Sequence, residues 1–289
     1  MAKWTADELP DMTGRTVLVT GAGSGLGLIT ARELGRAGAQ VVLGVRDTDK
    51  ATKAIIGMAG TFEVRHLDVA DLGSVRQFAE SWTGGLDILV NNAGVMDVPP
   101  IRTPQGFDVQ TATNYFGPFV LTNLLLPRIG DRVVSVTSQL HRQGKINLED
   151  LVWQSRKYHR MKAYYDSKLE IVLFSLELQR RLNASGSPVR SVLAHPGIAS
   201  TSLAAHSSSG FINRLGFLIN TPERGTLSIL YAATQDVPGN AYVGPDGPGS
   251  IRGYPKVRKP SSAGLDETTA RNLWRATAAL TGVGTEVAR

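Results

Sequence analysis

Tyr164 and Lys168 are the two residues whose types and spacing best suit proton transfer. They are four positions apart, so on a helix their side chains share one face. A free tyrosine has a pKa of about 10, too high for ready proton exchange near neutral pH, and a nearby ammonium lowers that pKa. The pair therefore predicts an acid–base group. Tyr158 and Lys162 have the same spacing, but they stand in a charged stretch that we expect to be exposed.

A glycine-rich turn near the N-terminus predicts a second kind of site, one for phosphate. Residues 20–27 read Thr-Gly-Ala-Gly-Ser-Gly-Leu-Gly and directly follow the apolar run 16–19. Gly21 lets the chain turn sharply, while Gly25 and Gly27 leave room for a pyrophosphate and for close packing of helix on strand. The amides at the helix start would then hold the phosphates. A tight turn without a ligand is the alternative, but the flanking strand and helix favour a dinucleotide site.

Arg46 indicates which dinucleotide to expect. The second strand-like run ends at Val45, near the position where an NAD site usually has an acid for the ribose hydroxyls, and Arg46 follows. A guanidinium suits a 2′-phosphate through paired hydrogen bonds. We therefore expect NADP(H), with NAD(H) as the alternative because the neighbouring Asp47 could serve a ribose.

The chain resembles the short-chain dehydrogenase/reductase family over nearly its whole length. The resemblance is carried, in the family's order, by residues 20–27, Asn91-Asn92-Ala93-Gly94, Asn114, Ser138, Tyr164 with Lys168, and Pro196-Gly197. It implies an NAD(P)-dependent oxidoreductase that interconverts an alcohol and a ketone or aldehyde, with hydride moving to or from the nicotinamide.

The resemblance also implies four catalytic residues. Tyr164 would be the general acid–base, and Lys168 would lower its pKa and bind the nicotinamide ribose. Ser138 would hold the substrate oxygen, and Asn114 would hold a water in a proton relay. Taken singly, Ser138 and Asn114 could equally make structural hydrogen bonds. Pro118 cannot donate to the helix that contains Asn114, so we expect a local irregularity there.

The cofactor-binding residues implied by the resemblance lie in the glycine-rich turn and after successive strands. They are Gly21, Ser24, Gly25, Leu26, Gly27, Arg46, Asp68, Val69, Asn91, Ala93, Gly94, Tyr164, Lys168, Pro196, Gly197 and Thr201. Asp68 would contact the adenine, and Asn91, Ala93 and Gly94 the adenosine side. Pro196, Gly197 and Thr201 would belong to a loop over the nicotinamide.

The spacing between Ser138 and Tyr164 departs from the family's commonest pattern, being about twice as long. The added segment 146–161 resembles the branch that contains retinol dehydrogenases and related carbonyl reductases, as do Arg46-Asp47 and His195-Pro196-Gly197. The retinol dehydrogenases of that branch often carry membrane anchors, which we do not expect here, so their substrate is not transferred.

Strand-like and helical runs alternate along the chain, which predicts a parallel sheet with helices on both faces. We expect strands at 16–20, 41–45, 63–67, 87–91, 132–137, 190–194 and, more weakly, 241–243. We expect helices near 26–37, 72–82, 106–128 and 163–182, after Pro222, and at 266–280. The predicted fold class is α/β: a single-domain, doubly wound parallel sheet (Rossmann fold) of about seven strands over residues 1–289. Residues 198–220 are expected to form a substrate loop or lid, and residues 246–263 an irregular surface.

Composition excludes several kinds of site. The chain has no cysteine, so it has no disulfide, thiolate metal site or cysteine nucleophile, and its five histidines lack metal-ligand spacing. We expect no metal. The net charge of +6 comes without a concentrated basic run, so we interpret it as a basic surface and expect no nucleic acid partner. Without a signal-peptide core or a long apolar run, we expect a soluble, cytoplasmic protein with no membrane segment.

The expected partner is a small carbonyl or alcohol substrate, apolar because residues 198–220 are rich in apolar side chains. A homodimer or homotetramer is expected from the habits of the family. A catalytically silent NADP-binding sensor is the main alternative, and a sugar-nucleotide epimerase is another. The intact set Asn114, Ser138, Tyr164 and Lys168 disfavours the sensor, and the glycine spacing and shorter chain disfavour the epimerase.

Overall fold

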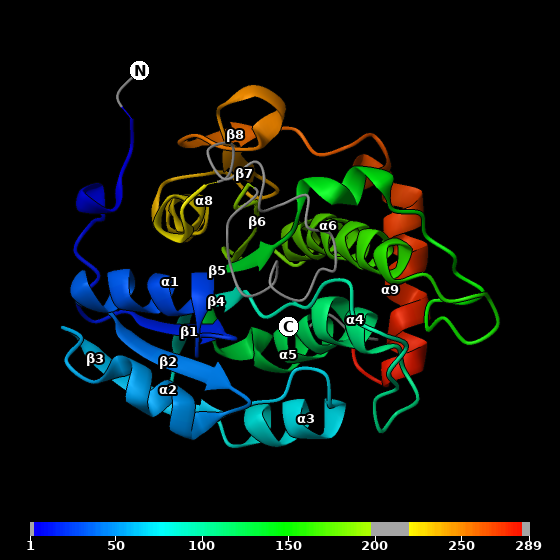
Figure 1. Ribbon diagram of the computed structural model, residues 1–289, viewed down its shortest axis with the longest axis horizontal. Helices are drawn as coiled ribbons and strands as arrows, with labels where there is room; N and C mark the ends of the chain where they lie inside the picture. Colours follow the sequence, from blue (N-terminus) through cyan, green and yellow to red (C-terminus); the bar gives the residue numbers. More distant parts are fainter. Residues whose placement is uncertain (1–2, 198–219, 285–289) are drawn as a thin grey trace.

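One eight-stranded sheet runs through the computed structural model, which describes residues 3–197 and 220–284 (Figure 1). Its strands are β1 (Thr16–Thr20), β2 (Gln40–Val45), β3 (Thr61–His66), β4 (Leu86–Asn91), β5 (Ile129–Val136), β6 (Arg190–Ala194), β7 (Tyr242–Pro245) and β8 (Pro255–Arg258). Their order is β3-β2-β1-β4-β5-β6-β7-β8, parallel throughout except for the antiparallel pair β7–β8. The chain reverses its direction of winding between β1 and β4, and such a switch point is where open α/β sheets bind ligands.

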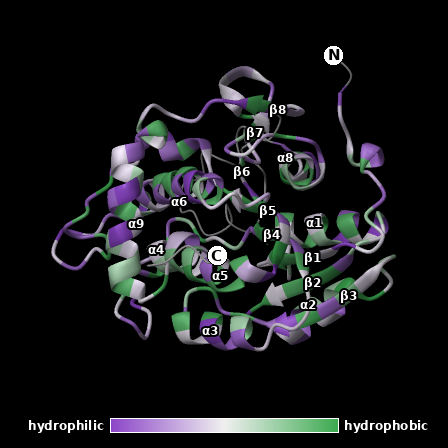
Figure 2. Ribbon diagram, turned by 180° about the vertical axis from the view of Figure 1, so that it is seen from behind, coloured by the Kyte–Doolittle hydropathy of each residue, from purple (hydrophilic) through white to green (hydrophobic). Residues whose placement is uncertain are grey.

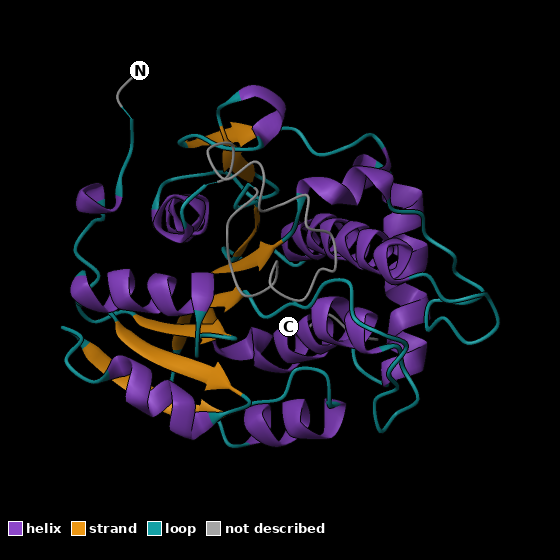
Figure 3. Cartoon of the chain, in the orientation of Figure 1, coloured by secondary structure: helices purple, strands orange, loops and turns teal. Residues whose placement is uncertain are grey.

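Helices cover both faces of this sheet (Figure 3). The first face carries α1 (Gly25–Arg36), α2 (Thr48–Ile55) and α8 (Pro222–Thr234). The second carries α3 (Leu72–Glu80), α5 (Gly117–Leu125) and α6 (Arg160–Ala184), with α9 (Glu267–Thr281) packed on α6. The short α4 (Val109–Thr111) precedes α5. This confirms the predicted doubly wound α/β fold.

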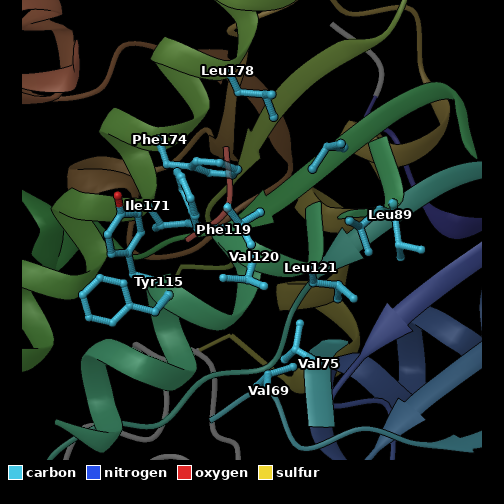
Figure 4. Close-up of a cluster of buried hydrophobic side chains, with 14 of the residues drawn as sticks. Val69, Val75, Leu89, Tyr115, Phe119, Val120, Leu121, Ile171, Phe174 and Leu178 are labelled. Atoms are coloured by element: carbon cyan, nitrogen blue, oxygen red, sulfur yellow. The ribbon is translucent and has the colours of Figure 1, made fainter. Parts of the chain in front are cut away.

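The larger hydrophobic core holds α5 and α6 against the second face (Figure 4). Tyr115, Phe119 and Phe174 meet there, with the ring centroids of Phe119 and Phe174 5.6 Å apart. The ring of Phe174 also stacks on Trp274 of α9. Figure 2 shows how hydropathy is distributed: hydrophobic residues lie on the central strands, and hydrophilic turns lie on the outer part of α9. Because α6 also carries Tyr164 and Lys168, this packing fixes the position of the predicted acid–base pair.

The structure differs from the sequence prediction at two elements. The sheet has eight strands rather than about seven, because β8 lies inside the segment expected to be irregular. Its strand form comes from pairing with β7, which a polar, proline-led sequence does not reveal. Helix α2 was not expected either, since it is only eight residues long, few of them are apolar, and Ala51 is its one buried residue.

The predicted irregularity near Asn114 is confirmed. The helical run expected over 106–128 consists of α4, a π-helical turn at Ala112–Phe116, α5 and a final 3-10 turn. A π-helical turn widens the backbone spiral by one residue and is frequent at functional sites.

Candidate active site

Tyr164 and Ser138 meet at the carboxyl end of β5. Ser138 is the second residue after β5, and its hydroxyl accepts a hydrogen bond from the Leu140 amide at 3.2 Å. The Tyr164 side chain reaches it from the first turns of α6 and hydrogen-bonds to the Ser138 side chain. The Thr137 hydroxyl donates to the carbonyl of Lys168 at 2.9 Å, which ties the end of β5 to α6. Strand and helix thus bring together two residues that are far apart in the sequence.

Burial determines the protonation of the acid–base pair. It raises the pKa of Tyr164 to about 12, against a smaller lowering by the Ser138 hydrogen bond. Burial also lowers the pKa of Lys168 to about 8, and its Nζ donates to the Val136 carbonyl at 3.2 Å. The sequence-based expectation was that Lys168 lowers the pKa of Tyr164. In this structure the Lys168 charge is not among the causes of the tyrosine's shift, and Nζ lies 5.8 Å from the ring centroid.

Asn114 lies within the π-helical turn and links three segments. Its Oδ1 accepts from the Val95 amide at 2.8 Å, and its Nδ2 donates to the Val95 carbonyl and to the Ser167 hydroxyl, each at 2.9 Å. Ser167 in turn donates to the carbonyl of Tyr164. Asn114 is therefore connected through one side chain to the helix turn that carries Tyr164. Sequence reasoning missed Ser167, although its place three residues after Tyr164 on the same helix was visible.

Two glycines of the first turn stand where a side chain would collide with neighbouring atoms of the protein. Gly21 has a φ of +66°, and a Cβ there would lie 2.9 Å from the Cα of Ala93. A Cβ at Gly27 would lie 2.6 Å from the carbonyl oxygen of Gly21. Ser24 precedes α1 without capping it through its side chain, and Gly25, Leu26 and Gly27 are the first three helical residues. Their amides lack acceptors within the helix, so this end can hold an anion.

The segment 91–94 is bonded to the end of β1. The Thr20 hydroxyl accepts from the amides of Asn92 and Ala93, each at 3.0 Å, and the Asn92 side chain donates to the Thr20 carbonyl at 2.8 Å. Asn91 donates to the Thr122 hydroxyl at 2.9 Å. A Cβ on Gly94 would lie 3.2 Å from Asn114 Oδ1 and 3.4 Å from Lys168 Nζ. The glycine-rich turn, Asn114 and Lys168 thus border one edge of the sheet.

The adenosine-side candidates lie at the ends of β2 and β3. Arg46 is exposed directly after β2, and Asp47 caps α2 by accepting the Lys50 amide at 2.9 Å. Asp68 is half-buried and accepts the Ala70 amide at 2.9 Å. Val69 is buried, and its carbonyl oxygen is so close to Gly117 that a side chain there would collide with it.

The nicotinamide-side candidates follow β6. Gly197 has a φ of +76°, and the Asn220 side chain donates to the Pro196 carbonyl at 3.1 Å. His195 is buried, and its Nε2 lies 3.0 Å from the Ser250 carbonyl oxygen. Thr201 and nearly all of the predicted lid, 198–219, lie outside the described residues.

Tyr158 is half-buried rather than exposed, but it is not part of the Ser138 site. Its hydroxyl accepts from Gln110 Nε2 at 2.8 Å and donates to the Val98 carbonyl at 3.4 Å. Its partner in spacing, Lys162, is exposed. Of the two tyrosine–lysine pairs, only Tyr164 and Lys168 adjoin Ser138 and Asn114. Within the described residues, no group of three or more acidic or histidine side chains could hold a metal ion.

The proteins that are similar to this chain agree with the geometry of the site. Residues 15–210 match the family model described as short chain dehydrogenase. The chain is 38% identical to human retinol dehydrogenase 13, over 93% of this chain and 85% of the relative. A crystal structure of an uncharacterized protein from Mycobacterium Paratuberculosis is 46% identical with a TM-score of 0.88, covering 99% of this chain and 100% of the other. The angucycline C-6 ketoreductase LanV with bound NADP is 26% identical with a TM-score of 0.61, covering 78% and 91% of the two chains.

Proposed function

The chain belongs to the short-chain dehydrogenase/reductase family, as an NAD(P)-dependent oxidoreductase of alcohols and carbonyl compounds, and we propose that Tyr164 transfers the proton and that NADP(H) is preferred. The observation that carries this proposal is the meeting of the Tyr164 phenol with Ser138 beside buried Lys168. A nicotinamide dinucleotide fits the sheet edge, because α1 begins there at Gly25 with no side-chain cap from Ser24, and its first amides are available to the phosphates. When bound, the nicotinamide supplies or accepts the hydride.

The side chains of the site have separate roles in binding the carbonyl oxygen and in moving the proton. With a pKa of about 12, the Tyr164 hydroxyl is protonated near neutral pH, and a neutral phenol is the form that can donate to a carbonyl oxygen as it gains negative charge. The Ser138 hydroxyl can donate to the same oxygen and hold it beside Tyr164. Burial makes Lys168 easier to deprotonate, so its ammonium can return a proton toward the site. Asn114 would position the relay water, with its amide held by the Val95 main chain.

The preference for NADP(H) rests on the end of β2. Arg46 is exposed, and among the residues that the structure describes it forms no ion pair that would compete for its guanidinium. The Asp47 carboxylate, the alternative ligand for a ribose, accepts the Lys50 amide and so helps to begin α2. A guanidinium free of carboxylates suits a 2′-phosphate.

The proposed substrate is largely apolar. Support comes from a relative, because human retinol dehydrogenase 13, similar over 93% of this chain, is named for an apolar alcohol; only the apolar character, not retinol itself, is carried over. None of the helices that the structure describes is long and apolar enough to cross a membrane. The homo-oligomeric state, the cytoplasmic location and the role of residues 198–220 as a lid stay predictions.

A panel of aldehydes and ketones tests the proposal, each incubated with NADPH and separately with NADH. We expect oxidation of NADPH by apolar members of the panel, at a higher kcat/KM than with NADH. Tight binding of NADPH without turnover of any compound would favour the sensor. Equal kcat/KM values with both cofactors would remove the proposed preference while leaving the reaction class intact.

A further inference from the structure

A cavity of about 600 Å³, largely open to solvent, lies at the opposite end of the sheet from Arg46. Its walls come from the 3-10 turn at Gln139–Gln143, the turn at Pro248–Ser250 and strand β8. This volume lies in the range of sites for small molecules. Because β2 and β8 are separated by five strands of the sheet, this cavity is distinct from the place proposed for the 2′-phosphate.

The cavity is positively charged. Arg142, Arg258 and Lys259 line it, and among the residues that the structure describes no acidic side chain does. Within residues 3–197 and 220–284, none of these three cations forms an ion pair. Three like charges around one hollow repel one another, and an anion between them would relieve that repulsion. The arrangement therefore favours a ligand group with negative charge.

Hydrogen bonds hold the walls in place. Arg142 Nη2 donates to the Lys259 carbonyl at 3.0 Å, which joins the 3-10 turn to the residue after β8 and leaves other guanidinium N–H groups for a ligand. The Tyr242 hydroxyl donates to Gln139 Oε1 at 3.4 Å, and the Ser250 carbonyl lies 3.0 Å from His195 Nε2. The charges of Arg142 and Arg258 oppose the rise that burial causes in the pKa of Tyr242, so both act at this wall.

One residue that lines the cavity is the sequence neighbour of a residue in the proposed active site. Gln139, which lines it, directly follows Ser138, which hydrogen-bonds to Tyr164. Consecutive Cα atoms are about 3.8 Å apart, so the main chain of the lining residue Gln139 lies next to that of Ser138, the residue proposed to hold the carbonyl oxygen. The exposed side chain of Val257 adds an apolar contact to the same wall.

We propose that this cavity binds a carboxylate or phosphate group, carried at the far end of a substrate whose carbonyl carbon lies at Ser138 and Tyr164. The inference rests on the proposed function and narrows its substrate class to amphiphiles with an apolar body and an anionic end. Arg258 is the cation whose contribution to anion binding can be removed with the least change to the rest of the structure. Its side chain has no hydrogen bond within the described residues, and β8 is held by its main chain.

The first experiment compares straight-chain aldehydes that end in a carboxylate with their methyl esters, over a series of chain lengths. The wild-type enzyme should prefer the acid to the ester in kcat/KM at the best length. Arg258→Gln should lower that preference by roughly five- to tenfold, as expected for one charge-assisted contact near the surface, with the ester unaffected. Lys256→Gln is the matched control, because Lys256 is exposed on the same strand and does not line the cavity.

The second experiment separates the two sources of the anion. Calorimetric titration of inorganic phosphate into the wild type and into Arg258→Gln detects an anion site without any turnover. Phosphate binding that Arg258→Gln weakens, without an acid preference among the aldehydes, would support the anion site and overturn its use by substrate. Equal turnover of acids and esters together with no phosphate binding would overturn the whole proposal. Failure of every aldehyde to react would count against the proposed function, and the titration would still decide on the cavity.

Discussion

Tyr164→Phe removes a single hydroxyl, and the structure separates its catalytic cost from its structural cost. Loss of a general acid–base should lower kcat/KM by about 10²- to 10⁴-fold, equivalent to about 3–5 kcal/mol of transition-state stabilisation. The hydroxyl has Ser138 as its hydrogen-bonding partner, and Ser138 keeps the bond from the Leu140 amide in the variant. The free energy of unfolding should therefore fall by only about 1 kcal/mol, the usual net value of one hydrogen bond.

Tyr158→Phe is the matched control, because it makes the same chemical change at the other tyrosine–lysine spacing. Gln110 would lose the Tyr158 hydroxyl but keep its 2.8 Å bond to the Arg160 carbonyl. We expect a similar loss of about 1 kcal/mol in unfolding free energy and turnover close to that of the wild type. Consumption of NADPH measures turnover, fluorescence titration measures NADPH binding, and urea unfolding measures stability. Substantial turnover in Tyr164→Phe, or inactivity confined to Tyr158→Phe, would refute the assignment.

Three further changes test the cofactor site and the buried lysine. Arg46→Ala should weaken NADPH binding by about tenfold and leave NADH binding unchanged, as measured by titration of each cofactor; equal weakening would contradict the phosphate assignment. Gly27→Ala would place a Cβ 2.6 Å from the Gly21 carbonyl oxygen, so it should cost about 1–3 kcal/mol of stability and weaken NADPH binding. Gly23→Ala is its control, since the nearest atom would be 3.6 Å away, and equal damage in both would argue against the clash. Burial lowers the Lys168 pKa from 10.5 to about 8, so between these pH values the unfolded chain holds a proton that the folded one has lost. Stability should therefore rise with pH across this window, by about 3 kcal/mol relative to Lys168→Met in urea unfolding, and parallel curves for the two proteins would show that the shift is absent.

The parts of the fold that could be predicted from the sequence are those whose local pattern and tertiary role agree. β1 and β6 begin and end where expected, because short apolar runs bounded by polar or glycine residues also form the buried centre of the sheet. The irregular helix around Asn114 was predicted because Pro118 has a local effect on hydrogen bonding. β8 could not be predicted in this way, since its pairing with β7 is what makes it a strand.

In the candidate site, too, some features could be predicted from the sequence and others could not. Residue types and spacing selected Tyr164 and Lys168, but their pKa values depend on burial, which spacing does not report. Tyr158 looked exposed because its sequence neighbours are charged, whereas its contact with Gln110 comes from a distant part of the chain. Properties that depend on contacts between distant parts of the chain therefore could not be predicted from the sequence.

The π-helical turn at Ala112–Phe116 gives the helix one residue more than a regular spiral needs. Deleting one residue there would let an unbroken α-helix form, so the polypeptide would keep its overall fold. Side chains before and after the turn would keep their directions, since the wide turn is what accommodates the extra residue. The Asn114 amide, which lies inside the turn, would lose the position from which it bonds to Val95 and Ser167. Shortening the chain by a single amino acid at this place would yield an intact but inert protein.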